Sequence, residues 1–288
     1  MNIAFATSAA NGDLTADDRL AAAALTARGA QVTPAVWNDP SVQWAGFDSV
    51  VIRSTWDYHR HADKIRDWIG SLESAGARVW NPPSVLRWNM EKTYLRDLER
   101  AGVPVVPTAW LARGSAADIG ALLDERSWRD VVVKPVISAG ATRTWRMGHA
   151  TAPDIHLQLA ESLELGDVMV QPFVPEIQTT GEWSLIFIDG EYSHAVRKTP
   201  TEGDFRVQTG FGGRSVTDEP GSAVLEAARR VLDAAPTPWL YVRVDGIETD
   251  AGFILLELEM LEPALFFSHS ASGTERFAES ILTRAHTR

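Results

Sequence analysis

Short apolar runs alternate with amphipathic segments over about the first eighty residues of the chain. The apolar runs have the length of strands and span residues 2–6, 32–37, 49–52 and 78–80. Between them, residues 13–28 and 65–75 place apolar side chains at helical spacing, and Gly29 and Gly76 follow where a helix commonly ends. This alternation predicts an open α/β domain built on a parallel sheet, which we place at residues 1–87.

Beyond residue 87 the pattern becomes mixed, because it contains a β-hairpin in addition to separate strands and helices. Extended segments are predicted at residues 103–110, 131–135, 168–172, 183–188, 192–196, 239–244 and 253–259. Helices are predicted at residues 91–101, 119–124, 223–235 and 274–285. Asp189-Gly190 forms the hairpin turn. We expect an α+β half that divides near residue 174, into residues 88–174 and 175–288.

Composition excludes several classes of protein. The 288 residues include 27 Lys and Arg against 38 Asp and Glu, a net charge of −11 that argues against nucleic-acid or anionic-membrane partners. The chain has no cysteine, which excludes disulfides, thiolate metal sites and a cysteine nucleophile. No apolar run approaches the ~20 residues of a membrane span, and residues 1–12 lack the features of a signal peptide. These features predict a soluble, cytoplasmic protein.

Three common catalytic motifs are missing from the sequence. It contains no G-x-x-x-x-G-K-[ST] phosphate loop, no G-x-G-x-x-G after the first strand and no G-x-S-x-G nucleophile elbow. The chemistry must therefore be sought among other charged residues.

Three carboxylates lie on or beside two neighbouring strands. Asp245 ends the strand 241–244, and the two-residue strand period places Glu257 and Glu259 on one face of the next strand. Close carboxylates repel unless a cation lies between them, and Mg²⁺ takes oxygen ligands of this kind. We interpret the three as a metal site; the alternative is a solvated acidic face on an edge strand.

Lysine is rare in this chain, and three of the four lysines stand at element boundaries. Lys92 opens a helix, Lys134 ends an apolar strand before the small-residue loop 138–141, and Lys198 ends the hairpin. An ammonium meets phosphate as a point charge, so this placement indicates convergence on a polyanion. The alternative is that each is an ordinary surface charge.

A polar and aromatic segment follows the strand 49–52 at its carboxyl end, the edge where open α/β sheets bind ligands. It contains Arg53, Trp56, Asp57 and Tyr58. Arg53 is suited to a substrate carboxylate and Asp57 to an ammonium. The alternative is a structural Arg–Asp pair on a tryptophan-lined loop.

The ordered set of motifs resembles the ATP-grasp superfamily. The motifs are Asn81-Pro82 ahead of Lys92, Lys134-Pro135 with its small-residue loop, Gln171-Pro172-Phe173-Val174-Pro175, Arg206 before Gly212-Gly213, and Asp245 with Glu257-x-Glu259. Their order is similar to glutathione synthetase-like members and spans about residues 81–267. Residues 53–58 and 257–263 are similar to the cycloserine synthetase group. The resemblance implies a pre-ATP-grasp α/β domain followed by two α+β subdomains with ATP between them.

The resemblance also implies a role for each matching position. Phosphates of ATP would be held by Lys92 and Lys134 under a lid of Ser138 to Ala141 that includes Gly140. The adenine hinge would consist of Gln171, Phe173 and Val174, with Glu182 on the ribose. The γ-phosphate and the substrate carboxylate would meet Arg197, Lys198 and Arg206, with Arg206 the candidate for stabilising the transition state. Two Mg²⁺ ions would be carried by Asp245, Glu257 and Glu259.

The chain departs from its relatives at three points. Its lid has one glycine where relatives often have three, and Glu259 and Gln208 stand where glutathione synthetase-type enzymes use Asn. The first departure bears on lid mobility, and Glu259 makes the metal site one charge more negative.

The chemistry that the resemblance implies needs no protein nucleophile, since phosphoryl transfer depends on positioning and charge neutralisation. A small amino-acid-like carboxylate would be activated by ATP and captured by a nitrogen, which in cycloserine synthetases belongs to the same molecule. Two alternatives are an intermolecular amino-acid or dipeptide ligase and a non-catalytic ATP-binding regulatory protein. Family analogy alone suggests a homodimer.

Overall fold

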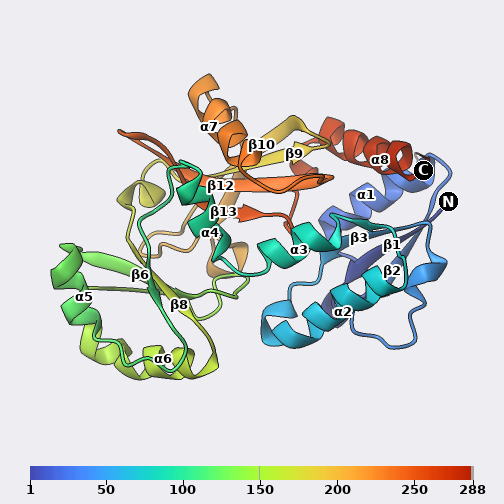
Figure 1. Cartoon of the computed structure of the whole chain (residues 1–288). Helices are drawn as coiled ribbons and strands as arrows, with labels where there is room; N and C mark the ends of the chain where they lie inside the picture. The colour runs from blue at the N-terminus through green and yellow to red at the C-terminus, as the bar shows by residue number, and fades with distance from the viewer. Residues whose placement is uncertain (149, 287–288) are drawn as a thin grey trace.

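A parallel sheet forms the N-terminal part of the chain, as predicted (Figure 1). The computed structural model describes residues 1–148 and 150–286. Strands β1 (Asn2–Thr7), β2 (Gln31–Val36), β3 (Ser49–Ser54) and β4 (Val79–Trp80) run in the order β2-β1-β3-β4, all parallel. Helices α1 (Ala16–Ala27) and α2 (Ala62–Ser74) connect them. The segment 53–58 therefore leaves the sheet at the carboxyl end of a central strand.

A five-stranded antiparallel sheet carries most of the acidic residues of interest. Its order is β11-β10-β9-β12-β13, with β9 (Glu182–Ile188), β10 (Glu191–Thr199), β11 (Arg214–Thr217), β12 (Tyr241–Thr249) and β13 (Gly252–Glu259). Helices α3 (Pro83–Asn89), α4 (Tyr94–Arg100) and α7 (Ser222–Asp233) accompany it. Leu95 and Leu98 of α4 share one apolar core with Leu185, Phe187 and Val244 of this sheet.

A smaller antiparallel sheet lies apart from the other two, at the lower left of Figure 1. Its order is β5-β8-β6-β7, with β5 (Ala109–Leu111), β6 (Asp130–Pro135), β7 (Trp145–Gly148) and β8 (Val168–Pro172). Helices α5 (Ile119–Arg126) and α6 (Ala152–Leu165) belong to this part. Leu123, Val131, Val133, Val168 and Val170 form a core of its own.

The first and the five-stranded sheets are firmly joined. Helix α8 (Ala271–His286) packs beside α1, and its Phe277 shares a core with Ile3 and Phe5. The buried Asn81 side chain donates to the carbonyls of Tyr241 and Met260, both at 2.8 Å, and accepts from the Leu240 amide at 2.6 Å. These bonds fix the strands that carry Asp245 and Glu257 against the N-terminal sheet.

The structure adds elements that the hydrophobic pattern does not predict: α3, α6, β7 and β11. Of the expected segment 103–110, only residues 109 and 110 lie in a strand, β5, because Pro104 and Pro107 have no amide to donate to a ladder. Within the described residues, no helix combines the length and apolar character needed to cross a bilayer.

Candidate active site

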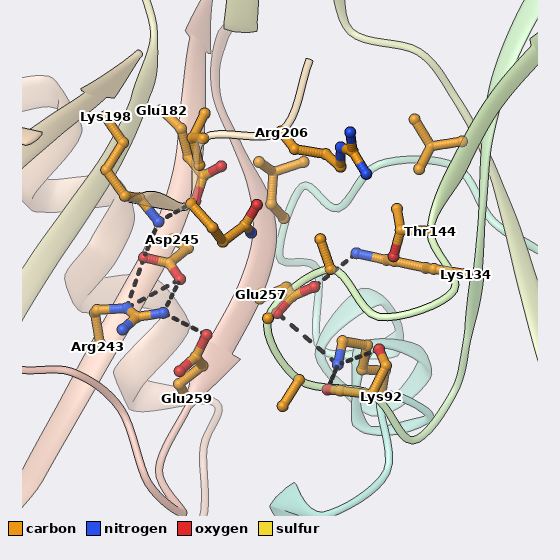
Figure 2. Close-up of a pocket in the computed structure, with 18 of the residues that line it drawn as sticks. Lys92, Lys134, Thr144, Glu182, Lys198, Arg206, Arg243, Asp245, Glu257 and Glu259 are labelled. Atoms are coloured by element: carbon orange, nitrogen blue, oxygen red, sulfur yellow. Dashed lines mark hydrogen bonds and ion pairs between the residues drawn. The ribbon is translucent and has the colours of Figure 1, made fainter. Parts of the chain in front are cut away.

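One cavity of about 550 Å³ gathers most of the predicted site residues. It is lined by the five-stranded sheet, by the smaller sheet with its 138–144 loop, and by the segment after β3. The predicted residues that line it are Trp56, Tyr58, Lys92, Lys134, Ser138, Gly140, Gln171, Phe173, Val174, Glu182, Lys198, Arg206, Asp245, Glu257 and Glu259. Figure 2 shows the charged members of this set pointing into a common space.

Glu257 joins the two predicted phosphate lysines. Its Oε1 accepts a hydrogen bond from Lys134 Nζ at 2.7 Å, and Lys92 Nζ lies 3.9 Å from Oε2. Lys92 Nζ also donates to the Ser138 carbonyl at 2.8 Å. Burial would raise the pKa of Glu257, but the charges of Lys134 and Lys92 outweigh it and lower the pKa to about 2. One ionised carboxylate on strand β13 therefore contacts strand β6 through Lys134 and, through Lys92, the start of the 138–144 loop.

Asp245 is held by a second group of cations (Figure 2). Arg243 donates from its terminal nitrogen to Asp245 Oδ2 at 2.8 Å, Ser184 Oγ contacts Oδ1, and Lys198 Nζ lies 3.6 Å away. Lys198 also donates to Glu182 at 2.5 Å. Burial would raise the pKa of Asp245, but Arg243 and then Lys198 lower it to about 2.

Glu259 accepts a hydrogen bond from the same terminal nitrogen of Arg243 that donates to Asp245, so the guanidinium bridges the two carboxylates. Burial raises the pKa of Glu259 to about 7. The charges of Asp245 and Glu257 add to this increase, and Arg243 offsets only part of it. Glu259 is therefore the least readily ionised of the three carboxylates assigned to the metal site.

The carboxylates fit Mg²⁺ by the chemistry of their oxygen donors, and they lie on neighbouring strands. Asp245 and Glu257 are direct partners across β12 and β13, and Glu259 follows on the same face. Hard oxygen donors of this type are what Mg²⁺ takes. Among residues 1–148 and 150–286, no three His, Cys, Asp or Glu side chains are grouped closely enough to hold an ion as they stand. Binding would therefore require the carboxylates to exchange lysine and arginine contacts for the metal.

The cavity also has apolar lining residues, which suit contact with a flat heteroaromatic ring. They include Val132, Phe173, Ile177, Ile247 and Leu256. Gln171 is oriented by a 3.0 Å hydrogen bond from its side chain to Thr108 Oγ1.

The 138–144 loop covers one side of the cavity and contains a single glycine, Gly140, at a φ of 60°. Ala141 and Arg143 also adopt positive φ, at 57° and 53°, where a side chain costs about 1–2 kcal/mol. Two non-glycine residues of this loop are therefore held at some conformational cost.

Three predicted residues do not reach the cavity. Arg53 is 2% exposed, donates to Asp18 Oδ1 at 2.9 Å and to the Pro263 carbonyl at 3.1 Å, and so has a structural pairing in place of the expected substrate contact. Asp57 accepts from Trp37 Nε1 at 2.8 Å. Arg197 points to the opposite face of β10 from Lys198, where it lies 3.4 Å from the Trp183 ring centroid.

Two further residues of the cavity were not predicted from the sequence. Arg243 lies two positions before Asp245 on the same strand, so the strand period contained a signal for it. Glu262 lies outside any strand; it belongs to the 257–263 segment of the resemblance, but its place beside the cavity is what marks it as a site residue. Arg206, which was predicted, lines the cavity and is paired with Asp204 at 2.8 Å.

Three sheets around a cavity that pairs lysines with strand-borne carboxylates define an ATP-dependent ligase of the ATP-grasp class. Residues 102–248 match the family described as prokaryotic glutathione synthetase, ATP-grasp domain. Residues 3–81 match the D-cycloserine synthetase DcsG, N-terminal domain. The chain belongs to the glutathione synthetase-like ATP-grasp family, so the predicted fold and family are confirmed.

The relatives support the same assignment over most of the chain. Cycloserine biosynthesis protein DcsG of Streptomyces lavendulae is 33% identical over 263 residues, covering 86% of this chain and 87% of the relative. Glutathione synthetase of Parasynechococcus marenigrum (strain WH8102) is 31% identical over 251 residues, covering 81% and 74%. The crystal structure of D-cycloserine synthetase DcsG has a TM-score of 0.89 at 28% identity, covering 99% of this chain and all of that one.

Membership in this family makes the chain a C–N bond-forming ligase that uses ATP and Mg²⁺ and acts on a small molecule.

Proposed function

We propose that the chain closes a ring within one amino-acid-like molecule, forming D-cycloserine from O-ureido-D-serine. The observation that carries this proposal is the match of both halves of the chain to D-cycloserine synthetase, including the N-terminal residues 3–81. That N-terminal part supplies Trp56 and Tyr58 to the cavity that also holds the lysines and carboxylates. The substrate end of the site is therefore built from the part of the chain that matches this enzyme.

The reaction balances as follows. The substrate carboxylate attacks the γ-phosphorus, which breaks the bond to ADP and gives an acyl phosphate. The nitrogen bonded to the side-chain oxygen attacks the acyl carbon; a C–N bond forms and inorganic phosphate leaves. One water releases the carbamoyl group as carbon dioxide and ammonia.

We assign the cations around the cavity to the charges that develop in these steps. Lys92 and Lys134 hold phosphate oxygens in exchange for their contacts with Glu257. Arg206 and Lys198 face the same space and neutralise the transferred phosphoryl group (Figure 2). Arg243 also lines the cavity, and we assign it to the negative charge that develops on the acyl oxygen.

We assign metal binding to Asp245, Glu257 and Glu259, and we expect two ions. Mg²⁺ bound there would neutralise phosphate charge and hold the nucleotide in line with the substrate. Gln171, Phe173 and Val174 would bind the adenine. Glu182, paired with Lys198, would reach the ribose.

The remaining expectations concern the whole chain. We propose that it acts in the cytoplasm, as a homodimer, and that residues 1–87, 88–174 and 175–288 form its three parts. Helix α4, within residues 88–174, shares an apolar core with the five-stranded sheet, so the second and third parts pack together there.

The test is ADP release from Mg-ATP, alone and with O-ureido-D-serine, with no added amine. Stimulation together with D-cycloserine detected by mass spectrometry supports the proposal, and O-ureido-L-serine is the matched control. Stimulation only by pairs of an acid and an amine would replace it with an intermolecular ligase. ATP binding without stimulation by O-ureido-D-serine would reject it.

A further inference from the structure

Glu262 is an exception among the acidic residues of the cavity. Its neighbours Glu182, Asp245, Glu257 and Glu259 each contact a lysine or an arginine. Glu262 is 8% exposed and lines the same cavity, yet over the described chain no hydrogen bond or ion pair joins its carboxylate to another residue. Ionising a buried carboxylate without a cation is costly, so a positive group from outside the protein would stabilise the charged form of Glu262.

The surroundings of Glu262 indicate which kind of cation fits. The aromatic side chains of Trp56, Tyr58 and Phe266 line the cavity with it. Trp56 Nε1 donates to the Glu262 backbone carbonyl at 3.0 Å, which ties the N-terminal loop to the end of β13. Aromatic faces attract an alkylammonium, whereas Mg²⁺ requires several oxygen ligands. The pocket is therefore chemically suited to an organic ammonium and poorly suited to a further metal ion.

The charges that act on Glu262 support the same interpretation. Burial raises the pKa of the Glu262 carboxyl to about 8, with repulsion from Glu259 adding to it and Lys92 and Arg243 offsetting part. A cation bound beside Glu262 would restore its ionised form.

We propose that Glu262 is the subsite for the α-ammonium group of the substrate, with Trp56, Tyr58 and Phe266 as its walls. This inference rests on the proposed function and narrows the substrate to zwitterionic amino acids. The ammonium and the reacting carboxylate are attached to one carbon. With the ammonium at Glu262, the carboxylate remains inside the cavity that Lys92 and Arg243 also line.

The experiment compares O-ureido-D-serine with 3-(ureidooxy)propanoic acid, which keeps the carboxylate and the nucleophilic nitrogen but lacks the ammonium. Binding of each compound to the protein with Mg-ADP is measured by isothermal titration calorimetry, which needs no turnover. ADP release from Mg-ATP is measured in parallel. The variants are Glu262→Gln, Glu262→Asp and the control Glu226→Gln, an exposed carboxylate on α7. The Trp56 bond is to the Glu262 backbone, so Glu262→Gln leaves it in place.

Wild-type protein should bind the ammonium-bearing compound about 10- to 100-fold more tightly, the range for a charge-assisted hydrogen bond. Glu262→Gln should lose that advantage by raising the KM of O-ureido-D-serine, with the KM of ATP and the Mg²⁺ dependence unchanged. Glu262→Asp should recover part of it, and Glu226→Gln should match wild type.

Two results would overturn the inference. One is the absence of a difference in preference: either Glu262→Gln still binds the ammonium-bearing compound more tightly, or wild-type protein binds the two compounds equally. The other is a Glu262→Gln variant whose main change is in ATP or Mg²⁺ dependence, which would place Glu262 among the metal ligands. Absence of ADP release with wild-type protein rejects the proposed function separately, because the binding preference is read without turnover.

Discussion

Replacing Glu257 with Gln tests the pairing of carboxylate and lysines at the centre of the site. The substitution keeps the shape of the side chain and removes its charge. Lys134 at 2.7 Å and Lys92 at 3.9 Å then face a neutral amide, in a place where the carboxylate is 24% exposed. We expect a loss of stability and a loss of activity from the same change.

The size of the stability effect follows from the pKa of Glu257, which is lowered from 4.5 to about 2. At about 1.4 kcal/mol per pH unit this corresponds to about 3 kcal/mol, reduced somewhat by solvent at a partly exposed group. The folded-state pKa lies below the unfolded one, so the stabilisation is present above about pH 4.5 and is lost as the pH falls towards 2. Glu257→Gln should therefore lower the unfolding free energy by about 2–3 kcal/mol at pH 7.5, and by less below pH 4.5.

The assay is urea unfolding followed by tryptophan fluorescence, at pH 7.5 and at a pH below 4.5, with Glu226→Gln as control. ADP release should fall about 100-fold or more, since the proposed metal ligand and the anchor of two lysines are lost together. A variant as stable as wild type would refute the assigned pairing. One that keeps more than a tenth of the wild-type ADP release would refute the metal assignment.

Three other perturbations have clear expected outcomes. Arg53→Met should lower the unfolding free energy by about 3–5 kcal/mol, because Asp18 is left buried without a cation. The KM of the folded variant for its substrate should change less than about two-fold. A large effect on KM at unchanged stability would instead indicate that Arg53 contacts the substrate. Asn81→Ala should lower the unfolding free energy measured in urea by about 3 kcal/mol, since three buried backbone groups lose their hydrogen-bond partner. An effect below about 1 kcal/mol would contradict the role of these three bonds. EDTA should stop ADP release yet lower the thermal unfolding midpoint by less than about 2 °C, because the carboxylates already have cationic partners in the protein. A larger drop in the unfolding midpoint would mean that folding depends on the metal.

The sequence predicts local features of this fold better than long-range ones. The N-terminal α/β alternation and the Asp189-Gly190 hairpin follow from periodicity and turn chemistry, which act over a few residues. Strand β11 was missed because it is a four-residue edge strand, of which three residues are exposed. Helix α6 was missed although Leu159 and Leu163 are both buried at helical spacing, so that signal was present and unused.

The candidate site shows the same limit. The strand-borne Lys134, Asp245 and Glu257 could be placed on elements from sequence, and they line one cavity in the structure. Arg53 could not be separated from a substrate ligand, because its partner Asp18 lies 35 residues earlier and its aromatic contacts, Tyr241 among them, come from the C-terminal part. Such pairings depend on tertiary packing, which residue spacing does not encode.

The contacts of Glu257 with Lys134 and Lys92 also constrain how this site can diverge during evolution. Losing either lysine leaves the acid unbalanced, and losing the acid leaves two ammonium groups facing one another, so single replacements pass through a destabilised protein. Coordinated replacement avoids that intermediate. We therefore expect descendants that abandon ligase chemistry to lose Glu257 and Lys134 together, and a homologue holding only one of the two to carry a compensating charge nearby.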